Sequence, residues 1–186
     1  MPMVAIDDDE DGVTPNAGGD VEAFETLIRE NQRMIHSLCY RMTGSMDDAA
    51  DLAQETFIQA HRHLTEFRGH AKVSSWLYRI AMNQCLNWQK SSQRRERLHR
   101  EWSEQQRDTA AREVDRRAQA VEQAILSLHP KQRAAIVLTV HEGLTHAEAA
   151  RALGCSETTV SWRLFAARRK LKRLLSKQQK SGRLHD

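Results

Sequence analysis

Apolar residues recur along this chain at spacings of three and four, the period of a helix that buries one face. Gly44, Gly143 and Gly154 interrupt the pattern and mark helix ends. The pattern predicts helices over about residues 20–43, 46–64, 75–90, 118–128, 130–142, 145–153 and 157–175. The chain is therefore expected to be all-α.

A polar segment separates two groups of these helices. Residues 91–117 hold little apolar material besides Leu98, Trp102 and Val114, so they cannot form a core by themselves. We expect two small helical domains joined by a polar, partly helical linker. The expected order is an acidic disordered tail, the first domain, the linker, the second domain and a basic tail, over residues 1–20, 21–90, 91–117, 118–175 and 176–186.

Composition agrees with small helical cores and adds a charge polarity. Of the 186 residues, 5% are aromatic and 28% are charged, which favours an all-helical protein. The net charge is only +3, but residues 7–11 read DDDED, whereas Arg163 to Arg183 holds nine Lys or Arg and no Asp or Glu. This polarity predicts phosphate binding near the carboxyl end and a solvated acidic tail at the other end.

Metal, membrane and catalytic chemistry find little support in the sequence. Cys39, Cys85 and Cys155 lack ligand spacing and are interpreted as reduced thiols, and His61 and His63 point apart on a helix. No apolar run approaches the ~20 residues of a membrane span, and the acidic amino terminus does not resemble a signal peptide. No nucleophile, base and oxyanion donor are spaced for catalysis. We expect a cytoplasmic protein that is not an enzyme and needs neither metal nor cofactor.

Residues 143–175 have the pattern of a helix-turn-helix. Thr145 and Glu148 are spaced as a capping box, Gly154 ends the first helix and Ser156 can cap the second. The second helix carries an apolar stripe at Val160, Leu164, Ala167, Leu171, Leu174 and Leu175. Its opposite face holds Thr158, Trp162, Phe165, Ala166, Arg169, Lys172 and Arg173. Outward aromatics beside cations predict a helix that reads DNA, and docking to a protein partner is the alternative.

The helix expected at 46–64 has an outer face of mixed character. Its members surround one apolar side chain and are Asp51, Gln54, Glu55, Ile58 and Arg62. An apolar centre ringed by charge is typical of a protein-docking patch. A solvated face with one stray isoleucine is also common. The residues alone leave both interpretations open.

The helix expected at 75–90 combines rings, cations and amides on one face. Trp76, Arg79, Asn83, Asn87 and Lys90 form a continuous stripe, and the loop just upstream reads FRGHAK. Rings stack on exposed bases and amides reach their hydrogen-bonding edges, so the stripe suits unpaired nucleic acid. The alternative is a half-buried Trp76 among solvated amides.

These motifs together resemble a known family. The first domain contains DAADLAQETFIQAHRHL followed by FRGHAKVSSWLYRIAMNQCLNW, which resembles region two of bacterial extracytoplasmic-function (ECF) sigma factors. The second contains LHPKQRAAIVLTVHEGLTHAEAARALGCSETTVSWRLFAARRKL, which resembles their region four. The resemblance covers about residues 21–90 and 118–175, and this order of motifs is not shared by other helix-turn-helix regulators.

The resemblance implies a factor that binds the clamp helices and flap of core RNA polymerase. It would direct polymerase to −10 and −35 promoter elements, in duplex and unpaired DNA, and assist strand opening. Polymerase contacts are implied at Asp51, Gln54, Glu55, Ile58 and Arg62. Contacts to the −10 element are implied at Phe67, Arg68, Gly69, His70, Lys72, Trp76, Arg79, Asn83 and Asn87. Contacts to the −35 element are implied at Thr158, Ser161, Trp162, Arg163, Phe165, Arg168 and Arg169.

Members of this family are usually restrained by an anti-sigma partner, so one is expected here. Trp162 stands where members often carry a small polar or basic residue, so their base preference does not transfer. The leading alternative function is a stand-alone helix-turn-helix regulator that binds duplex DNA as a dimer, without polymerase. A third class, a polymerase-binding protein that blocks sigma factors, would not need a promoter-reading helix.

Overall fold

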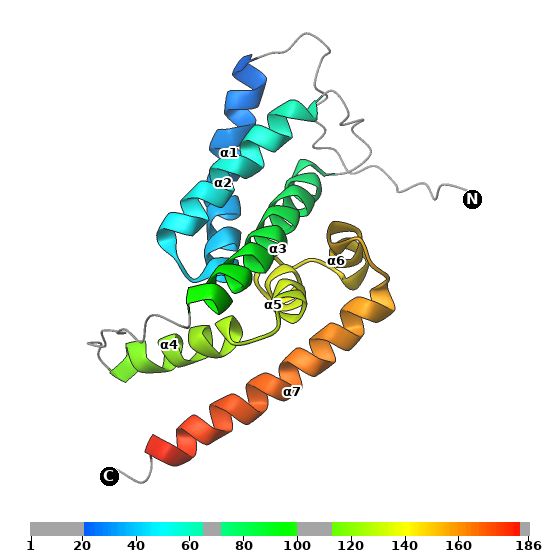
Figure 1. Ribbon diagram of the computed structural model, residues 1–186. Coiled ribbons are helices and arrows are strands. Elements are labelled where there is room, and N and C mark those ends of the chain that lie inside the picture. Colours follow the sequence, from blue (N-terminus) through cyan, green and yellow to red (C-terminus); the bar gives the residue numbers. More distant parts are fainter. Residues whose placement is uncertain (1–20, 65–71, 100–112, 183–186) are drawn as a thin grey trace.

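The computed structural model describes residues 21–64, 72–99 and 113–182, and every regular element in these ranges is helical (Figure 1). The all-α fold class is thereby confirmed. The expected acidic tail, the centre of the linker and the loop residues Phe67, Arg68, Gly69 and His70 lie outside the described residues.

Three helices form a first bundle, namely α1 (Val21–Thr43), α2 (Met46–Arg62) and α3 (Val73–His99). Gly44 has a φ of +75°, a left-handed value that glycine adopts readily, and it lets the chain reverse between α1 and α2. Ser45 then caps α2 by accepting a hydrogen bond from the N–H of Asp48 at 3.3 Å. Local sequence signals therefore set the turn that pairs these two helices.

Helical spacing predicts a core stripe on α3 at Val73, Leu77, Ile80, Ala81 and Trp88, and the buried face of the helix differs from it. Leu77 and Ala81 are buried as expected, but Val73, Ile80 and Trp88 are only half-buried against the core. The other buried positions are Tyr78, Met82, Cys85 and Gln89. The reason is that α3 packs against α1 and α2 and also against the second bundle, so it needs a wider buried surface than one stripe.

The second bundle contains α4 (Glu113–Leu126), α5 (Pro130–Ile136), the π-helical segment η2 (Val137–His141), α6 (His146–Leu153) and α7 (Glu157–Gly182). On α7 the predicted stripe is confirmed, because Val160, Leu164 and Ala167 are buried and its later leucines are half-buried. The helix lies along α5 and α4, and Nζ of Lys170 donates to the carbonyl of Ser127 at 2.5 Å.

Several helices extend further than predicted. α3 continues from the expected end at Lys90 to His99, and α4 begins at Glu113 instead of near Ala118. α7 likewise continues through Gly182 into the segment expected to be a basic tail. These extensions are rich in Arg, Lys, Glu and Gln, which favour helix even where no apolar stripe marks it.

The two bundles pack against each other where α3 meets α6 and α5, and where the end of α1 meets α4 and α5. Arg133 of α5 is buried, and its guanidinium donates hydrogen bonds to four backbone carbonyls, those of Met42, Ile125, Leu126 and Leu128. Carbonyls at helix ends lack intrahelical donors and carry partial negative charge, so they suit a cation. Burial lowers the pKa of Arg133 to about 10, which still leaves it charged at neutral pH. Figure 1 shows α5 at the centre of the molecule, where this contact lies.

Replacing Arg133 with Met is expected to lower the free energy of unfolding by about 2–4 kcal/mol, because buried carbonyls lose a charged donor. Urea unfolding followed by circular dichroism measures this loss. Lys131→Met is the matched control, since Lys131 is an exposed cation on the same helix, and it should change stability by less than about 0.5 kcal/mol. Equal losses in the two variants would contradict the role of the carbonyl contacts.

Candidate functional site

The helix-turn-helix is confirmed, and local polar contacts fix its geometry. Thr145 Oγ1 accepts from the N–H of Glu148 at 3.2 Å, and Glu148 Oε2 accepts from the N–H of Thr145 at 2.8 Å. The Thr145 hydroxyl also bonds to this carboxylate, and these contacts hold the pKa of Glu148 below its ordinary value. Gly154 is left-handed at φ +57°, and Ser156 Oγ accepts from the N–H of Thr159 to cap α7.

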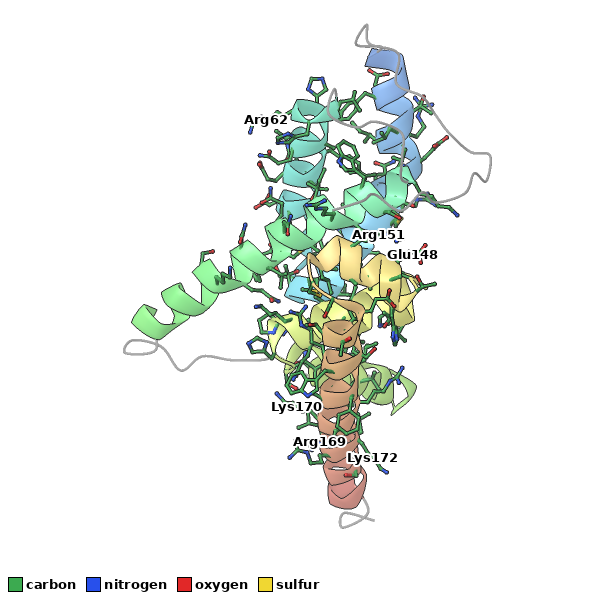
Figure 2. The ribbon with its side chains drawn as sticks, turned by 90° about the vertical axis from the view of Figure 1, so that its right-hand side faces the viewer. Arg62, Glu148, Arg151, Arg169, Lys170 and Lys172 are labelled. Atoms are coloured by element: carbon green, nitrogen blue, oxygen red, sulfur yellow. The ribbon has the colours of Figure 1, made fainter. Side chains whose placement is uncertain are left out.

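The outer face of α7 exposes aromatic and cationic side chains, as predicted. Trp162 is 66% exposed and Phe165 63% exposed, which is unusual for large apolar groups. The guanidinium carbon of Arg169 lies 5.9 Å from the Phe165 ring centre, within cation–π range. Figure 2 shows Arg169, Lys170 and Lys172 on the part of α7 beyond α6. We call the reading face the exposed set Thr158, Ser161, Trp162, Phe165, Arg168 and Arg169.

Two residues predicted to contact DNA have partners within the protein. Ser161 Oγ lies 3.0 Å from Nδ1 of His146, at the start of α6. Arg163 is half-buried, and its Nη1 donates to Sγ of Cys155 at 3.4 Å in the turn. Nothing in the sequence pattern signalled His146, because the contact joins two helices whose crossing is a tertiary feature.

On α3, most of the predicted stripe faces solvent. Arg79, Asn83 and Asn87 are exposed, and we call them with Trp76 the α3 stripe. Trp76 itself is half-buried and packs against the core, which matches the alternative considered from the sequence. Lys72, just before α3, is exposed, whereas the remaining loop residues lie outside the described ranges.

On α2, the structure brings together the five residues of the predicted docking patch, Asp51, Gln54, Glu55, Ile58 and Arg62. Four of them are exposed, with Ile58 38% exposed at the centre. Glu55 is half-buried and accepts a hydrogen bond from Nε2 of Gln59 at 2.7 Å. The patch therefore offers an apolar centre with carboxylate, amide and guanidinium groups around it.

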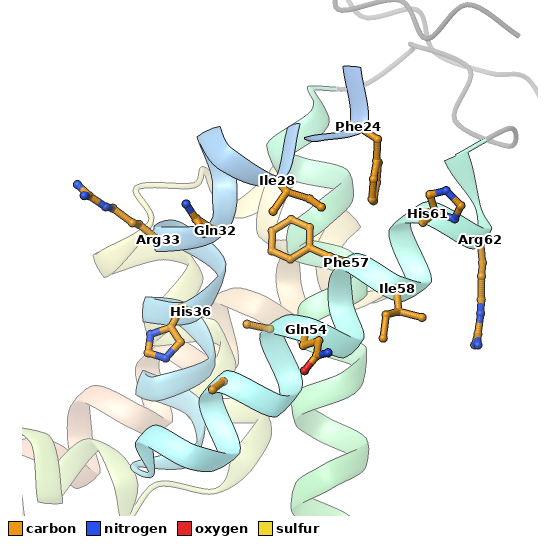
Figure 3. Close-up of a pocket in the computed structure, with 12 residues that line it drawn as sticks. Phe24, Ile28, Gln32, Arg33, His36, Gln54, Phe57, Ile58, His61 and Arg62 are labelled. Atoms are coloured by element: carbon orange, nitrogen blue, oxygen red, sulfur yellow. The ribbon is translucent and has the colours of Figure 1, made fainter. Parts of the chain in front are cut away.

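A groove of about 930 Å³ runs beside the docking patch, between α1 and α2 (Figure 3). Its apolar wall includes Phe24, Ile28, Phe57 and Ile58, and the Phe24 ring meets the His61 ring edge-on at 4.9 Å between centres. Its polar rim is formed by Gln32, Arg33, His36, Gln54, His61 and Arg62. Sequence reasoning missed this groove because Phe24 and Ile28 follow the same helical apolar spacing as the buried Ile35 and Leu38. The available signal was that α1 carries more apolar residues than one buried stripe needs.

Within the described part of the chain, no three or more His, Cys, Asp or Glu side chains are grouped to hold a metal ion. None of the helices in these ranges combines the length and apolar character that a bilayer crossing requires.

In comparisons with known proteins, both bundles match the same protein family. Residues 27–95 match Sigma-70 region 2, and residues 118–171 match Sigma-70, region 4. The chain is 38% identical over 170 residues to the ECF RNA polymerase sigma factor SigM of Mycobacterium tuberculosis, an alignment covering 86% of this chain and 81% of the relative. The chain belongs to the ECF sigma factors.

Further relatives support this assignment. This sigma factor is 29% identical to the RNA polymerase sigma factor YlaC of Bacillus subtilis over 88% of its own length and 98% of the relative. It also resembles the solved structure of CnrH in complex with the cytosolic domain of CnrY, with a TM-score of 0.64 and 26% identity over 85% of this chain and 90% of that one. The predicted resemblance is confirmed, and the sigma-factor interpretation prevails over a stand-alone regulator.

Replacing Thr145 with Ala is expected to lower the free energy of unfolding of this sigma factor by about 1 kcal/mol at neutral pH, through loss of the α6 cap. Glu148 has a lowered pKa in the folded state, so its share of the stability exists above the unfolded pKa and is lost as pH falls through the folded one. The difference between wild type and Thr145→Ala should therefore shrink in acid. Urea unfolding at neutral pH and below the glutamate reference value of 4.5 measures it. A difference that grows in acid would contradict the capping box.

Proposed function

We propose that this sigma factor binds core RNA polymerase through the docking patch and reads a two-element promoter with α3 and α7. The observation that carries the proposal is the presence of two different surfaces on one chain. The reading face lies on the second bundle, and the docking patch with its groove lies on the first. A protein that only binds an operator needs a face that reads DNA, but it does not need a patch that docks on polymerase.

The α3 stripe is proposed to hold an unpaired base of the −10 element. Asn83 and Asn87 present amides that can reach a base edge, while Arg79 can contact a phosphate. Removing a base from the stack costs a few kcal/mol, which stacking and edge contacts offset. The loop from Phe67 to Lys72 is proposed to complete this surface.

The reading face is proposed to enter the major groove of the −35 element. Exposed Trp162 and Phe165 fit apolar contact with thymine methyl groups, and Thr158 and Ser161 can bond base edges. Arg168 and Arg169 are suited to phosphates. Arg163 is proposed to contact a phosphate and also to support the turn, because its guanidinium donates a hydrogen bond to Sγ of Cys155.

The proposal also includes where the protein acts and how it is controlled. It acts in the cytoplasm, where polymerase is, and the chemistry of RNA synthesis belongs to polymerase rather than to this chain. We also propose control by an anti-sigma factor that covers the groove, because a long apolar wall with a basic rim suits an amphipathic helix. CnrH, whose solved structure this chain resembles, has the cytosolic domain of CnrY bound to it, which supports control by a protein partner.

Transcription in vitro tests the function directly. Core polymerase with this sigma factor should produce new transcript 5′ ends on a library of bacterial promoter fragments, each start sharing two upstream elements. Ile58→Glu should reduce these transcripts at least tenfold, on the order expected for a buried charge at an interface centre. Met46→Glu is the matched control, because Met46 is a 60% exposed apolar residue on α2 outside the docking patch. Absence of new starts with wild type would overturn the function, and equal effects of both variants would overturn the patch.

Replacing Arg169 with Ala should weaken promoter binding and make its salt dependence shallower by about 0.9 in log affinity per log salt, the value for one lost phosphate contact. Fluorescence anisotropy on promoter fragments from the transcription experiment measures both. Lys170→Ala is the control, since this neighbouring cation is bound to the carbonyl of Ser127 and turned from the reading face. A slope unchanged by Arg169→Ala would remove Arg169 from the phosphate contacts.

A further inference from the structure

A hydrogen bond ties the first residue of α6 to the reading face. Oγ of Ser161 lies 3.0 Å from Nδ1 of His146, and both side chains are exposed. His146 directly follows Thr145, so the capping box fixes its backbone. On α7, Val160 and Leu164 are buried, which fixes the direction in which Ser161 points. The contact is therefore held from both helices.

The turn between α6 and α7 keeps the two partners at this distance. The N–H of Cys155 bonds the carbonyl of Ala150 at 3.0 Å, and Arg163 of α7 donates to Sγ of Cys155. The bonds that build the helix-turn-helix thus also set the helix crossing. His146 is expected to stay beside Ser161 when the reading face meets DNA.

A serine hydroxyl without a partner in the protein carries little base information. It has one proton to donate and two lone pairs that accept, so it can rotate to suit either a base amine or a base carbonyl. A hydroxyl that gives its proton to a neighbouring side chain can only accept. In the major groove it then matches adenine N6 or cytosine N4, the amines of the base edges. A hydroxyl that accepts from its neighbour matches the oxygens of guanine and thymine instead.

The imidazole of His146 decides which of these roles Ser161 has. A neutral imidazole carries one N–H, and the nitrogen without it is an acceptor. In water the neutral side chain carries its proton more often on Nε2 than on Nδ1. The nitrogen that faces Ser161 is Nδ1, so this form of the ring takes the hydroxyl proton. Only the lone pairs of Ser161 then remain for a base.

Large rings flank Ser161 on the reading face. Trp162 follows it directly and Phe165 lies one turn further, and these side chains are 66% and 63% exposed. In a groove they would exclude water from the contact between Ser161 and a base. A mismatched base then leaves a polar group without a partner, which costs more than the same mismatch in water.

We propose that His146 is a positioning residue for base recognition. By taking the hydroxyl proton, it makes Ser161 an acceptor that favours adenine or cytosine over guanine or thymine at one position of the −35 element. The base preference rests on the proposed function, because it needs the reading face in the major groove. The direction of the bond between Ser161 and His146 does not.

Transcription by the holoenzyme tests the base preference. A promoter used by wild type is changed to all four bases at each −35 position, and transcripts are counted by sequencing. Ser161→Ala identifies the position that Ser161 reads, because preference changes only there. At this position wild type should favour adenine or cytosine about fivefold, the value of one hydrogen bond, and His146→Ala should reduce the ratio to less than about twofold.

Two further variants separate positioning from loss of affinity. Asp in place of His146 can only accept and suits the first turn of a helix, so His146→Asp should keep the fivefold ratio while its charge weakens binding to every sequence. Arg151→Ala is the matched control, since it removes an exposed cation of α6 and should leave the ratio unchanged. A wild-type ratio in His146→Ala, loss of the ratio in His146→Asp, or an equal loss in Arg151→Ala would overturn the inference.

Nitrogen-15 NMR of the imidazole tests the direction of the bond without DNA. Spectra of the full chain are recorded near pH 8, about where histidine side chains are ordinarily neutral, and His146→Ala identifies the His146 signals. Nδ1 should carry no proton, and Ser161→Ala should shift its signal. A protonated Nδ1, or a signal that does not move, would overturn the inference whether or not the protein reads promoters.

The two experiments also distinguish this inference from the proposed function. New transcripts whose base preference does not depend on His146 would overturn the inference and leave the function standing. No new transcripts with core polymerase, together with a bare Nδ1 that responds to Ser161→Ala, would overturn the function and the base preference while the direction of the bond stands.

Discussion

The contact on which this arrangement of helices depends is a buried guanidinium that, among the described residues, bonds backbone carbonyls and no carboxylate. Arg133 satisfies the carbonyl ends of α1 and α4 at the same time, and Gln89 of α3 bonds the same Met42 carbonyl. The last carbonyls of a helix lack hydrogen-bond donors, and a buried guanidinium needs several acceptors, so each group satisfies the other here. An apolar side chain would fill the space but leave buried carbonyls unpaired. Hydrogen bonds around Arg133 thereby connect α1 and α3 of the first bundle to α4 and α5 of the second.

Around this point the proposed functional surfaces are divided between three helices. The docking patch lies on α2, the stripe on α3 and the reading face on α7, each backed by buried residues of the same helix. A helix held by its apolar side presents its other side with little freedom, which favours precise contacts.

Many of these structural features could be predicted from the sequence. The periodicity placed the helices, and the capping chemistry of Thr145 and Ser156 placed two helix starts, because these signals act over three or four residues. The exposed Trp162 and the patch around Ile58 followed from helical geometry in the same way. Helix ends without caps were predicted less well, since charged segments continue a helix without changing the pattern.

The sequence by itself determined the all-α fold, the helix-turn-helix and which faces of α2, α3 and α7 carry polar or aromatic groups, because each is set by neighbours along one helix. Only the tertiary structure decided that Trp76 leans on the core, that α1 and α2 enclose a groove, and that Tyr78 meets Glu142. Those outcomes depend on how helices cross and on bonds between residues far apart in the chain. Periodicity records the face a helix buries, but not the neighbour against which it is buried.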